Sequence, residues 1–512
     1  MQKKIRFLNT IKYLKIKQIY YRVFYLIRQK IRIKLRYEYA KIENIKQVKL
    51  ILQKSIYSYQ TYKLNSFSFL NLQKQFTSEI DWNYSVFGKL WTYNLSYFDF
   101  LHQKEITKDE GVEFILSFIE SDTLLKDAKE SFPISLRGIN WIKFLSLHSI
   151  SNSKIDNVLY NHYCILLDNL EYHLLGNHLL ENGFSLLFGA YYFENEKLYV
   201  KAKEILDAEL KEQILNDGAH FELSPMYHQI MLFRVLDCIN LVENNAFKNH
   251  ELLELLKKKA SLMLGWLENI SYENGEVPLL NDSAHCVAPT TKNLLEYAKR
   301  LNVVVVKKEL KDSGYRKVKN SKYECIVDIG QIGPDYIPGH AHSDTFNFVV
   351  QKDNQPFIVD TGLSTYETNE RRTKERSTSS HNTVEVNTKD QSEVWGGFRV
   401  ANRAYITQVE EKNNSIRATH DGYKKDNIFH TRKWVFEDDK IIIEDSLSKE
   451  ADAVARVHFH PDVTKEKVLN SIVTDSKVEV IEYKYAPEFN KLVNAFAIEI
   501  KFRKNLKVEI KL

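Results

Sequence analysis

Two histidines separated by a single residue are the strongest chemical signal in this sequence. They occur in the run Pro-Gly-His-Ala-His at 338–342, shortly before an alternating apolar run at 346–350. In an extended chain, residues two apart point to the same side, so His340 and His342 can present two imidazoles together. Imidazole is a common metal ligand and titrates close to neutral pH. The pair therefore predicts metal binding or proton transfer; the alternative is two solvated loop histidines.

Two further residues extend His342 into a candidate metal site. Asp360 ends an apolar, strand-like run, and His381 stands just before another. Two imidazoles and one carboxylate suit a borderline ion such as zinc, so His342, Asp360 and His381 are the predicted ligands of Zn2+. Without an ion, the same residues would form a hydrogen-bonded His–Asp pair. No organic cofactor is expected.

Polar residues also gather in a segment with helical character. Asn177, His178, Glu181 and Asn182 place amide, imidazole and carboxylate groups within six positions. Asn177 and Glu181 are one helical turn apart, so they share a face. The segment therefore brings an amide and a carboxylate together on one side of a helix.

A tyrosine beside a histidine marks the start of another apolar helix. Tyr227 and His228 follow Ser-Pro, and a third polar cluster stands at 281–285 after an apolar run. The phenol of Tyr227 could be an exposed acid or base. It could equally be a packed residue at an ordinary helix start.

The elements that must position these residues show two kinds of spacing between apolar residues. Apolar residues repeat at helical spacing at 155–174 and 252–267, and the chain up to about 310 reads as helices without strands between them. After 320, short alternating runs separated by turn residues indicate strands. They lie at 323–329, 346–350, 383–386, 434–436, 441–443, 454–459 and 478–481. We predict an α+β multidomain protein, with an α/α toroid (an incomplete (α/α)-barrel) at 38–315 and an antiparallel β-sandwich at 316–512.

The first 37 residues form a third region, the N-terminal arm. It contains twelve Lys or Arg and no acid, so the net charge of +5 leaves −7 on the remaining residues. Ile16, Ile19, Tyr20, Val23, Phe24, Ile27 and Ile31 repeat at helical spacing within it. A basic amphipathic helix could lie on an anionic membrane surface or dock on the protein body.

Composition limits the remaining classes of function. No apolar run is long enough to span a bilayer, and charges interrupt every candidate secretory signal, which predicts the cytoplasm or the cytoplasmic membrane face. Four widely spaced cysteines suggest free thiols, without a disulfide framework or a thiolate zinc site. A nucleic-acid partner is not expected, because the chain outside the arm is acidic and shows no recognition motif. The oligomeric state is open.

Together, these motifs resemble those of the heparinase II/III family of polysaccharide lyases, which includes heparinase II/III-like and alginate lyases. The resemblance covers roughly residues 80–460, in the same order. Its motifs are Asn-His-x-x-Glu-Asn at 177–182, Ser-Pro-Met-Tyr-His at 224–228, His-x-His-Ser-Asp at 340–344, and Arg-Ser-Thr at 376–378 leading to His-Asn-Thr at 381–383. Further landmarks stand at 90–99 and 135–141. The resemblance implies an α/α toroid followed by a β-sandwich, with the active site between them.

The resemblance also implies roles for these residues in β-elimination on a uronic acid. Asn177 and His178 would stabilise the charge at the substrate carboxylate, and Tyr227 would be base, acid or both, with His340 as its neighbour. Glu181 would orient His178. The metal would be mainly structural and would hold His340 in the cleft.

Remaining candidates for substrate binding or orientation are Asn182, His228 and Arg376, with Arg371 and Arg372 as further sources of positive potential. The expected substrate is an anionic polysaccharide. All of these roles require Tyr227 and His340 to meet across a groove between the domains.

Two departures widen the choice of function. Well-known lyases of the family carry a secretory signal and act in the periplasm, which is therefore the alternative location. The basic arm is more similar to relatives that make capsule or O-chain. A non-lyase protein of capsule or O-chain biosynthesis that binds a sugar polymer in the same cleft is thus one alternative to the lyase. A zinc-dependent hydrolase is the other.

Overall fold

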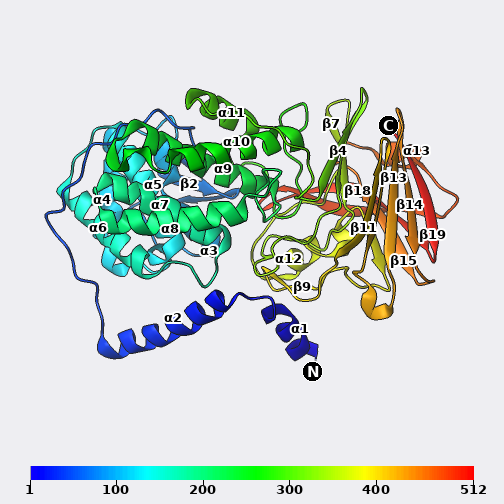
Figure 1. Ribbon diagram of the computed structural model, residues 1–512, viewed down its shortest axis with the longest axis horizontal. Coiled ribbons are helices and arrows are strands. Elements are labelled where there is room, and N and C mark those ends of the chain that lie inside the picture. The colour runs from blue at the N-terminus through cyan, green and yellow to red at the C-terminus, as the bar shows by residue number, and fades with distance from the viewer. Residues whose placement is uncertain (1) are drawn as a thin grey trace.

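The computed structural model describes residues 2–512 and contains two large parts and a separate arm (Figure 1). Helices dominate the first part, drawn on the left, and strands dominate the second, on the right. The arm, helices α1 (Gln2–Ile11) and α2 (Ile16–Leu35), runs along the lower edge of both parts. The predicted order of helical toroid and β-sandwich is therefore correct.

The helical part is built around two helices that are buried on nearly every side. These are α5 (Ser131–Leu147) and α7 (Gly176–Tyr192), which pack against each other, and α7 also packs against α8 (Glu196–Gln213) and α9 (Pro225–Asn244). Their buried side chains include Trp141, Leu180 and Leu236. The other helices are α3 (Lys89–Tyr97), α4 (Lys108–Glu120), α6 (Ser153–Asp168), α10 (Leu253–Ile270) and α11 (Thr291–Arg300).

A small antiparallel sheet interrupts the helical part, where the sequence predicted helices alone. Its strands are β1 (Tyr62–Lys63), β2 (Ser66–Phe69) and β3 (Leu72–Gln75). Leu70 and Asn71 join β2 to β3 with positive φ angles of 55° and 61°, which suit a tight hairpin turn. Phe67 and Phe69 are buried against aromatic side chains of the helical part.

The second part is a sandwich of antiparallel sheets. A six-stranded sheet has the order β11-β12-β13-β14-β19-β16, and four-stranded sheets have the orders β17-β18-β15-β8 and β4-β5-β6-β7. Their inward side chains, among them Trp434, Phe348 and Ile498, form one apolar core, because alternate strand residues point inward.

The first strands of this part are β4 (Tyr315–Lys319), β5 (Tyr323–Asp328), β6 (Phe348–Lys352), β7 (Gln355–Ile358), β8 (Val384–Val386), β9 (Val394–Trp395) and β10 (Arg399–Val400). They are followed by β11 (Ile406–Lys412), β12 (Ser415–His420), β13 (His430–Phe436), β14 (Lys440–Leu447), β15 (Ala453–His458), β16 (Ile472–Val473), β17 (Val478–Glu488), β18 (Lys491–Phe502) and β19 (Asn505–Lys511). Two short helices, α12 (Glu370–Glu375) and α13 (Lys465–Ser471), lie between strands.

Candidate active site

Tyr227 and His340 meet where the two parts of the molecule join. Their ring centroids lie 3.9 Å apart and the ring planes are inclined by 30°, which is a stacked arrangement. Tyr227 stands in the first turn of α9, where Ser224 caps the helix by accepting a hydrogen bond from the Tyr227 backbone amide. His340 lies on the loop between β5 and β6. The folded chain thus brings together the two residues that the sequence analysis required to meet.

A single buried carboxylate, Asp282, fixes the histidine pair. Its Oδ2 atom lies 2.9 Å from Nδ1 of His340, and its Oδ1 atom lies 2.8 Å from Nε2 of His342. Arg372 donates to both oxygens, at 2.5 and 2.7 Å. Burial raises the pKa of Asp282, but Arg372, His340 and His342 outweigh that effect and hold the pKa well below its usual range. Asp282 is therefore ionised, and His340 carries its proton on Nδ1.

The other ring nitrogen of His340 faces Asn177 and Glu222. His340 Nε2 is 3.4 Å from the amide nitrogen of Asn177 and 3.6 Å from Glu222 Oε2. Asn177 donates its backbone and side-chain N–H groups to Glu222, at 2.8 to 3.1 Å. Gly176 permits this approach: its φ is 58°, and a Cβ there would lie 2.7 Å from Glu222 Oε1. The Asn177 amide is thus held by Glu222 beside His340.

His178 is oriented by Glu171, and the prediction that Glu181 orients it is wrong. His178 Nδ1 lies 3.0 Å from Glu171 Oε1, and Asn182 donates to the other Glu171 oxygen at 2.9 Å. Burial lowers the pKa of His178, but Glu171, Glu222 and Glu181 raise it by more, so the net shift is upward. His178 therefore presents a partly exposed imidazole with a strengthened tendency to be cationic.

Glu181 pairs instead with Arg234, at 3.2 Å, and both line the main cavity of the site. This cavity has a volume of about 360 Å³ and is also lined by Asn177 and Tyr227. Glu181 Oε2 and Arg234 Nη1 are buried and have no hydrogen-bond partner within residues 2–512. Burial raises the pKa of Glu181 despite the neighbouring Arg234. The pair can therefore both donate and accept hydrogen bonds toward a ligand in the cavity.

Tyr227 is protonated in this environment. Burial raises the pKa of its phenol; a hydrogen bond from the Tyr366 hydroxyl, at 3.3 Å, lowers it only in part, and the negative charges of Asp282 and Glu222 raise it further. A neighbouring cation would have to lower this pKa for Tyr227 to act as a base. The structure shows the opposite shift, which suits a proton donor.

Two predicted substrate-orienting residues, His228 and Arg376, are buried and do not line the cavity. His228 is buried, and its ring accepts the backbone N–H of His220 through Nδ1 and contacts the Met263 carbonyl through Nε2. Arg376 is also buried and donates to the carbonyls of Ala341 and Gly397, so it shapes the loop that carries His340. Both corrections have one cause: burial leaves these polar groups to be satisfied by the backbone.

The other two arginines predicted as sources of positive potential also have partners. Arg372 is bound to Asp282, as described, and Arg371 contacts Glu375 at 2.7 Å. Each guanidinium therefore faces a carboxylate of the protein itself.

The three predicted metal ligands lie together behind His340. His381 Nδ1 is 2.7 Å from Asp360 Oδ2, and the rings of His342 and His381 are 5.3 Å apart. His342 Nδ1 and His381 Nε2 are buried without a hydrogen-bond partner in the described chain, which fits two nitrogen ligands. Asp360 is already bonded to His381, Asn347 and the Gly362 amide. No group of three or more His, Cys, Asp or Glu side chains is arranged as a metal site in residues 2–512.

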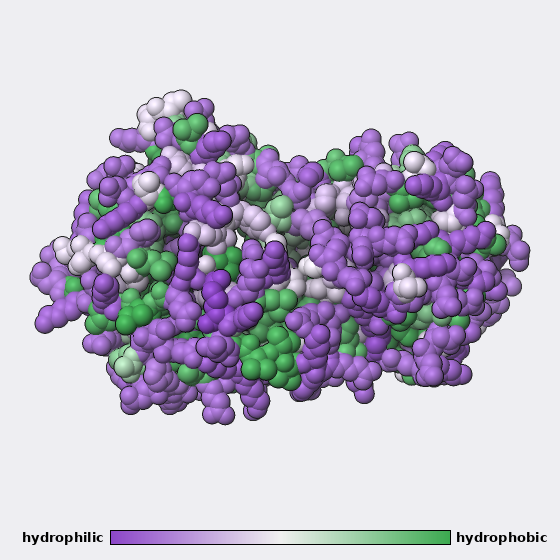
Figure 2. Space-filling view, turned by 90° about the horizontal axis from the view of Figure 1, so that it is seen from above, coloured by the Kyte–Doolittle hydropathy of each residue, from purple (hydrophilic) through white to green (hydrophobic). Residues whose placement is uncertain are grey.

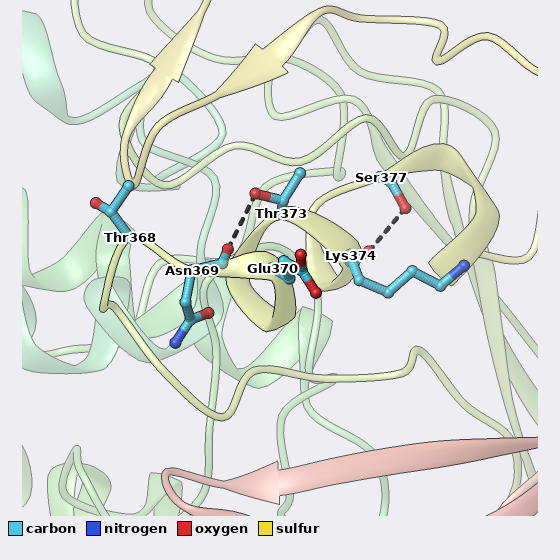
Figure 3. Close-up of a pocket in the computed structure, with 6 residues that line it drawn as sticks. All are labelled: Thr368, Asn369, Glu370, Thr373, Lys374 and Ser377. Atoms are coloured by element: carbon cyan, nitrogen blue, oxygen red, sulfur yellow. Dashed lines mark hydrogen bonds between the residues drawn. The ribbon is translucent and has the colours of Figure 1, made fainter.

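A second hollow, shown in Figure 3, lies over the segment that contains α12. It is lined by Thr368, Asn369, Glu370, Thr373, Lys374 and Ser377. The hydroxyls of Thr373 and Ser377 donate to the backbone carbonyls of Asn369 and Lys374, so they serve the local turn (Figure 3). The acid–base groups described above are all outside this hollow.

Comparison with known proteins identifies the class. The family model for the heparinase II/III N-terminus matches residues 135–309, and the model for the heparinase II/III-like C-terminal domain matches residues 306–505. The chain therefore belongs to the heparinase II/III family.

Individual relatives are more distant. A heparin-sulfate lyase from Bacteroides stercoris is 23% identical over 337 residues, which are 59% of this chain and 47% of that protein, so the match spans about half of the relative's length. A solved heparinase III has a TM-score of 0.63 at 15% identity, covering 86% of this chain and 80% of the other. A heparan sulfate lyase from Pedobacter heparinus has a TM-score of 0.54 at 17% identity, covering 87% and 81%. These likenesses extend the shared fold to most of the chain.

Several residues of the site carried too little signal to be assigned from the sequence. Glu171, Glu222, Arg234, and Tyr366 stand in unremarkable surroundings, and only contacts between distant segments reveal their roles. Asp282 was part of the polar cluster at 281–285, so its segment was noted without a role.

Proposed function

We propose that this protein is a polysaccharide lyase that cleaves a uronic-acid polymer by β-elimination in the cavity between the helical part and the β-sandwich. The observation that carries the proposal is the stacked pair of Tyr227 and His340. One ring is a protonated phenol and the other an imidazole whose Nδ1 proton is held by Asp282. Together they provide an acid and a base at one place.

His340 is the proposed base. Its Nε2 removes the proton at C5 of the uronate, the electron pair forms the C4–C5 double bond, and the C4–O4 bond breaks. Tyr227 gives its proton to the departing O4. The imidazolium of His340, stabilised by Asp282 and by Glu222 at 3.6 Å, then returns a proton to the stacked phenolate. Atoms and charge balance without any further reagent.

The negative charge that builds up on the substrate carboxylate needs preorganised donors. Arg234 Nη1 is a buried donor without a partner in the described chain, and Glu181 beside it has a raised pKa that favours a shared proton. His178 adds an imidazole whose cationic form is favoured, because Glu171 and other acids raise its pKa. These three groups, with the Asn177 amide nearby, are the proposed carboxylate-binding set.

The charge of the cavity indicates which uronate polymer would fit. Lys143 and Arg234 line it, and each is paired with a carboxylate, at 2.6 Å to Asp237 and 3.2 Å to Glu181. Asp99 adds negative charge, and tyrosine and phenylalanine side chains cover much of the wall. A densely sulfated chain needs several unpaired cations, so the proposed substrate is an unsulfated or sparsely sulfated uronate polymer. Capsule or exopolysaccharide material is the proposed source.

The other two functions fit the structure less well. A protein that only binds sugar has no need for a protonated tyrosine stacked on an oriented imidazole. A zinc-dependent hydrolase would need its metal ligands in the cavity, but His342 and His381 are completely buried and do not line it.

The test is incubation with a panel of uronate polymers, unsulfated and sulfated, followed by the ultraviolet absorbance of the unsaturated product. We expect activity on unsulfated polymers, and a loss of about 10²–10⁴-fold in Tyr227→Phe. Tyr366→Phe is the matched control, because it removes a hydroxyl 3.3 Å away that does not contact His340 through a hydrogen bond. Cleavage that yields only saturated ends, or full activity in Tyr227→Phe, would refute the lyase mechanism.

A zinc ion held by His342 and His381, with Asp360 as the third group, remains part of the proposal. Its support is the pair of buried, unpartnered nitrogens described above. A bound ion would supply structural rigidity to the loops around His340. His342→Ala should lower zinc content and thermal stability together, whereas His430→Ala, a buried histidine of the β-sandwich, should lower stability alone. Unchanged zinc content in His342→Ala would remove the assignment.

A further inference from the structure

The N-terminal arm docks on the protein with its polar side. Gln18, the one buried residue of α2, donates to the Leu174 carbonyl at 3.0 Å. Arg28 bonds to Asp168 at 3.0 Å, and the Tyr25 hydroxyl donates to the Leu170 carbonyl at 2.5 Å. Tyr21 stacks on Tyr172, with centroids 4.7 Å apart. The sequence was compatible with docking or membrane contact, and the structure shows docking through this polar and aromatic face.

Helix α1 makes the same kind of contact with the β-sandwich. Thr10 accepts a hydrogen bond from the Trp395 indole at 3.0 Å, and the Arg6 guanidinium lies over the Trp395 ring. The Arg403 guanidinium stacks on Tyr13, between α1 and α2, at 3.6 Å from the ring centroid. The arm therefore rests on both parts of the molecule, as Figure 1 shows along their lower edge.

The apolar side of the arm faces away from the protein. Ile16, Val23 and Ile27 are 86%, 51% and 54% exposed. The same exposed side of α2 includes Ile19, Tyr20, Phe24, Leu26 and Ile31, and α1 exposes Ile5, Phe7 and Leu8. This arrangement is the reverse of a surface helix that packs by its apolar stripe. An apolar face of this length on a soluble domain indicates a binding surface.

The positive charge of the arm indicates what its apolar side binds. The arm contains twelve Lys or Arg and no acid. Lys30 and Lys34 are exposed on α2, and Lys3 and Lys4 on α1, next to the apolar residues. A second copy of the chain would place two such cationic faces against each other, which is repulsive. An anionic bilayer offers hydrocarbon for the isoleucines and headgroups for the lysines.

We propose that residues 3–35 bind the surface of an anionic lipid membrane, with the apolar side of α1 and α2 lying in the interface. The helices lie in the membrane plane, and none of those described is long and apolar enough to span a bilayer. Because the polar side of the arm stays bound to the helical part and the β-sandwich, the arm can bind lipid without detaching from them. The face seen from above, away from the arm, is mostly hydrophilic with scattered apolar areas (Figure 2).

The test is co-sedimentation of the full chain with phosphatidylglycerol vesicles and with phosphatidylcholine vesicles. We expect binding to the anionic vesicles, weaker binding as salt rises, and little binding to the neutral ones. Ile27→Glu should weaken binding by about tenfold or more, because it places a charge in the hydrocarbon boundary. Gln29→Glu makes the same charge change two residues away, at an exposed position on another side of α2, and should keep most of the affinity.

Three results would overturn the proposal. One is equal binding of wild type to neutral and anionic vesicles, or no binding to either. Another is an equal loss in Ile27→Glu and Gln29→Glu, since the effect would then reflect net charge alone. The third is a wild-type dimer that Ile27→Glu converts to monomer, seen by analytical ultracentrifugation without lipid, which would assign the face to self-association. Circular dichroism of both variants verifies that they are folded.

Discussion

Replacing Asp282 by Asn tests whether this carboxylate prepares His340 for catalysis. Asp282 holds Arg372 through two hydrogen bonds and contacts Nδ1 of His340 and Nε2 of His342. Asparagine has nearly the same shape, so no cavity forms. It carries no charge, however, and its amide group can donate to His340. The proton of His340 would then move to Nε2, the nitrogen that must accept a proton from the substrate.

Two magnitudes follow from these contacts. Arg372 is completely buried, and leaving its charge without a partner costs about 3–5 kcal/mol of unfolding free energy. Loss of the general base lowers kcat by about 10²–10⁴-fold. The catalytic loss should appear in kcat more than in KM, because Asp282 does not line the cavity.

Asp445→Asn is a matched control. Asp445 is buried in the β-sandwich, where it accepts two hydrogen bonds from Arg432 at 2.8 and 2.9 Å and contacts His430 at 2.7 Å. Like Asp282, it binds one buried arginine through both carboxylate oxygens, but it contacts a single histidine, His430, and does not contact His340. Urea unfolding should show a similar loss of stability in both variants.

Assays of β-elimination then separate the catalytic role of Asp282 from its structural role. We expect activity to fall only in Asp282→Asn, measured at a temperature at which both variants are folded. If Asp282→Asn kept kcat within about tenfold of wild type while losing stability, Asp282 would be a structural residue and His340 would not depend on it for its tautomer.

Three more predictions concern residues around the site. Glu171→Gln should lower the pKa of His178, because Glu171 raises it. The alkaline limb of the pH–rate profile should then move to lower pH. An unchanged limb would exclude His178 as a required cation. Burial lowers the pKa of His228 to about 3, below its unfolded value of about 6.5. The contribution of the neutral His228 to stability is therefore fully present above about pH 6.5 and is lost as the pH falls toward 3. In urea unfolding at pH 7.5 and pH 5, His228→Gln should lose less stability between the two pH values than wild type does. Gln18→Ala removes donors to two backbone carbonyls in the loops before α7 and His340, and should lower the unfolding free energy by about 1–3 kcal/mol in urea titrations; no change would show that these bonds do not brace the loops.

The sequence was most informative where a pattern is local. Helical and alternating periodicity reflect which side of an element is buried, so they predicted a helical part followed by a β-sandwich. The three-stranded sheet at 62–75 was not predicted, because its strands of two to four residues are too short to show alternation. The arm was predicted as an amphipathic helix, but the side that docks could not be read from its pattern.

Partners of polar groups were not predictable in the same way. Glu181 stands one helical turn after Asn177, yet its side chain pairs with Arg234 of α9. The partner of His178 is instead Glu171, which lies in the loop before α7. A buried carboxylate binds whichever cation the fold brings within reach, and that choice depends on how separate helices pack.

By itself, the sequence determined the kinds of groups available: the histidine pair at 340 and 342, the tyrosine at the start of α9, and a basic helix with an apolar stripe. Only the tertiary structure decided their states. It stacked Tyr227 on His340, raised the pKa of that phenol by burial, and turned the apolar side of α2 outward. Residue types are fixed by covalent chemistry, whereas pKa, tautomer and exposure depend on neighbours that the folded chain brings from distant positions.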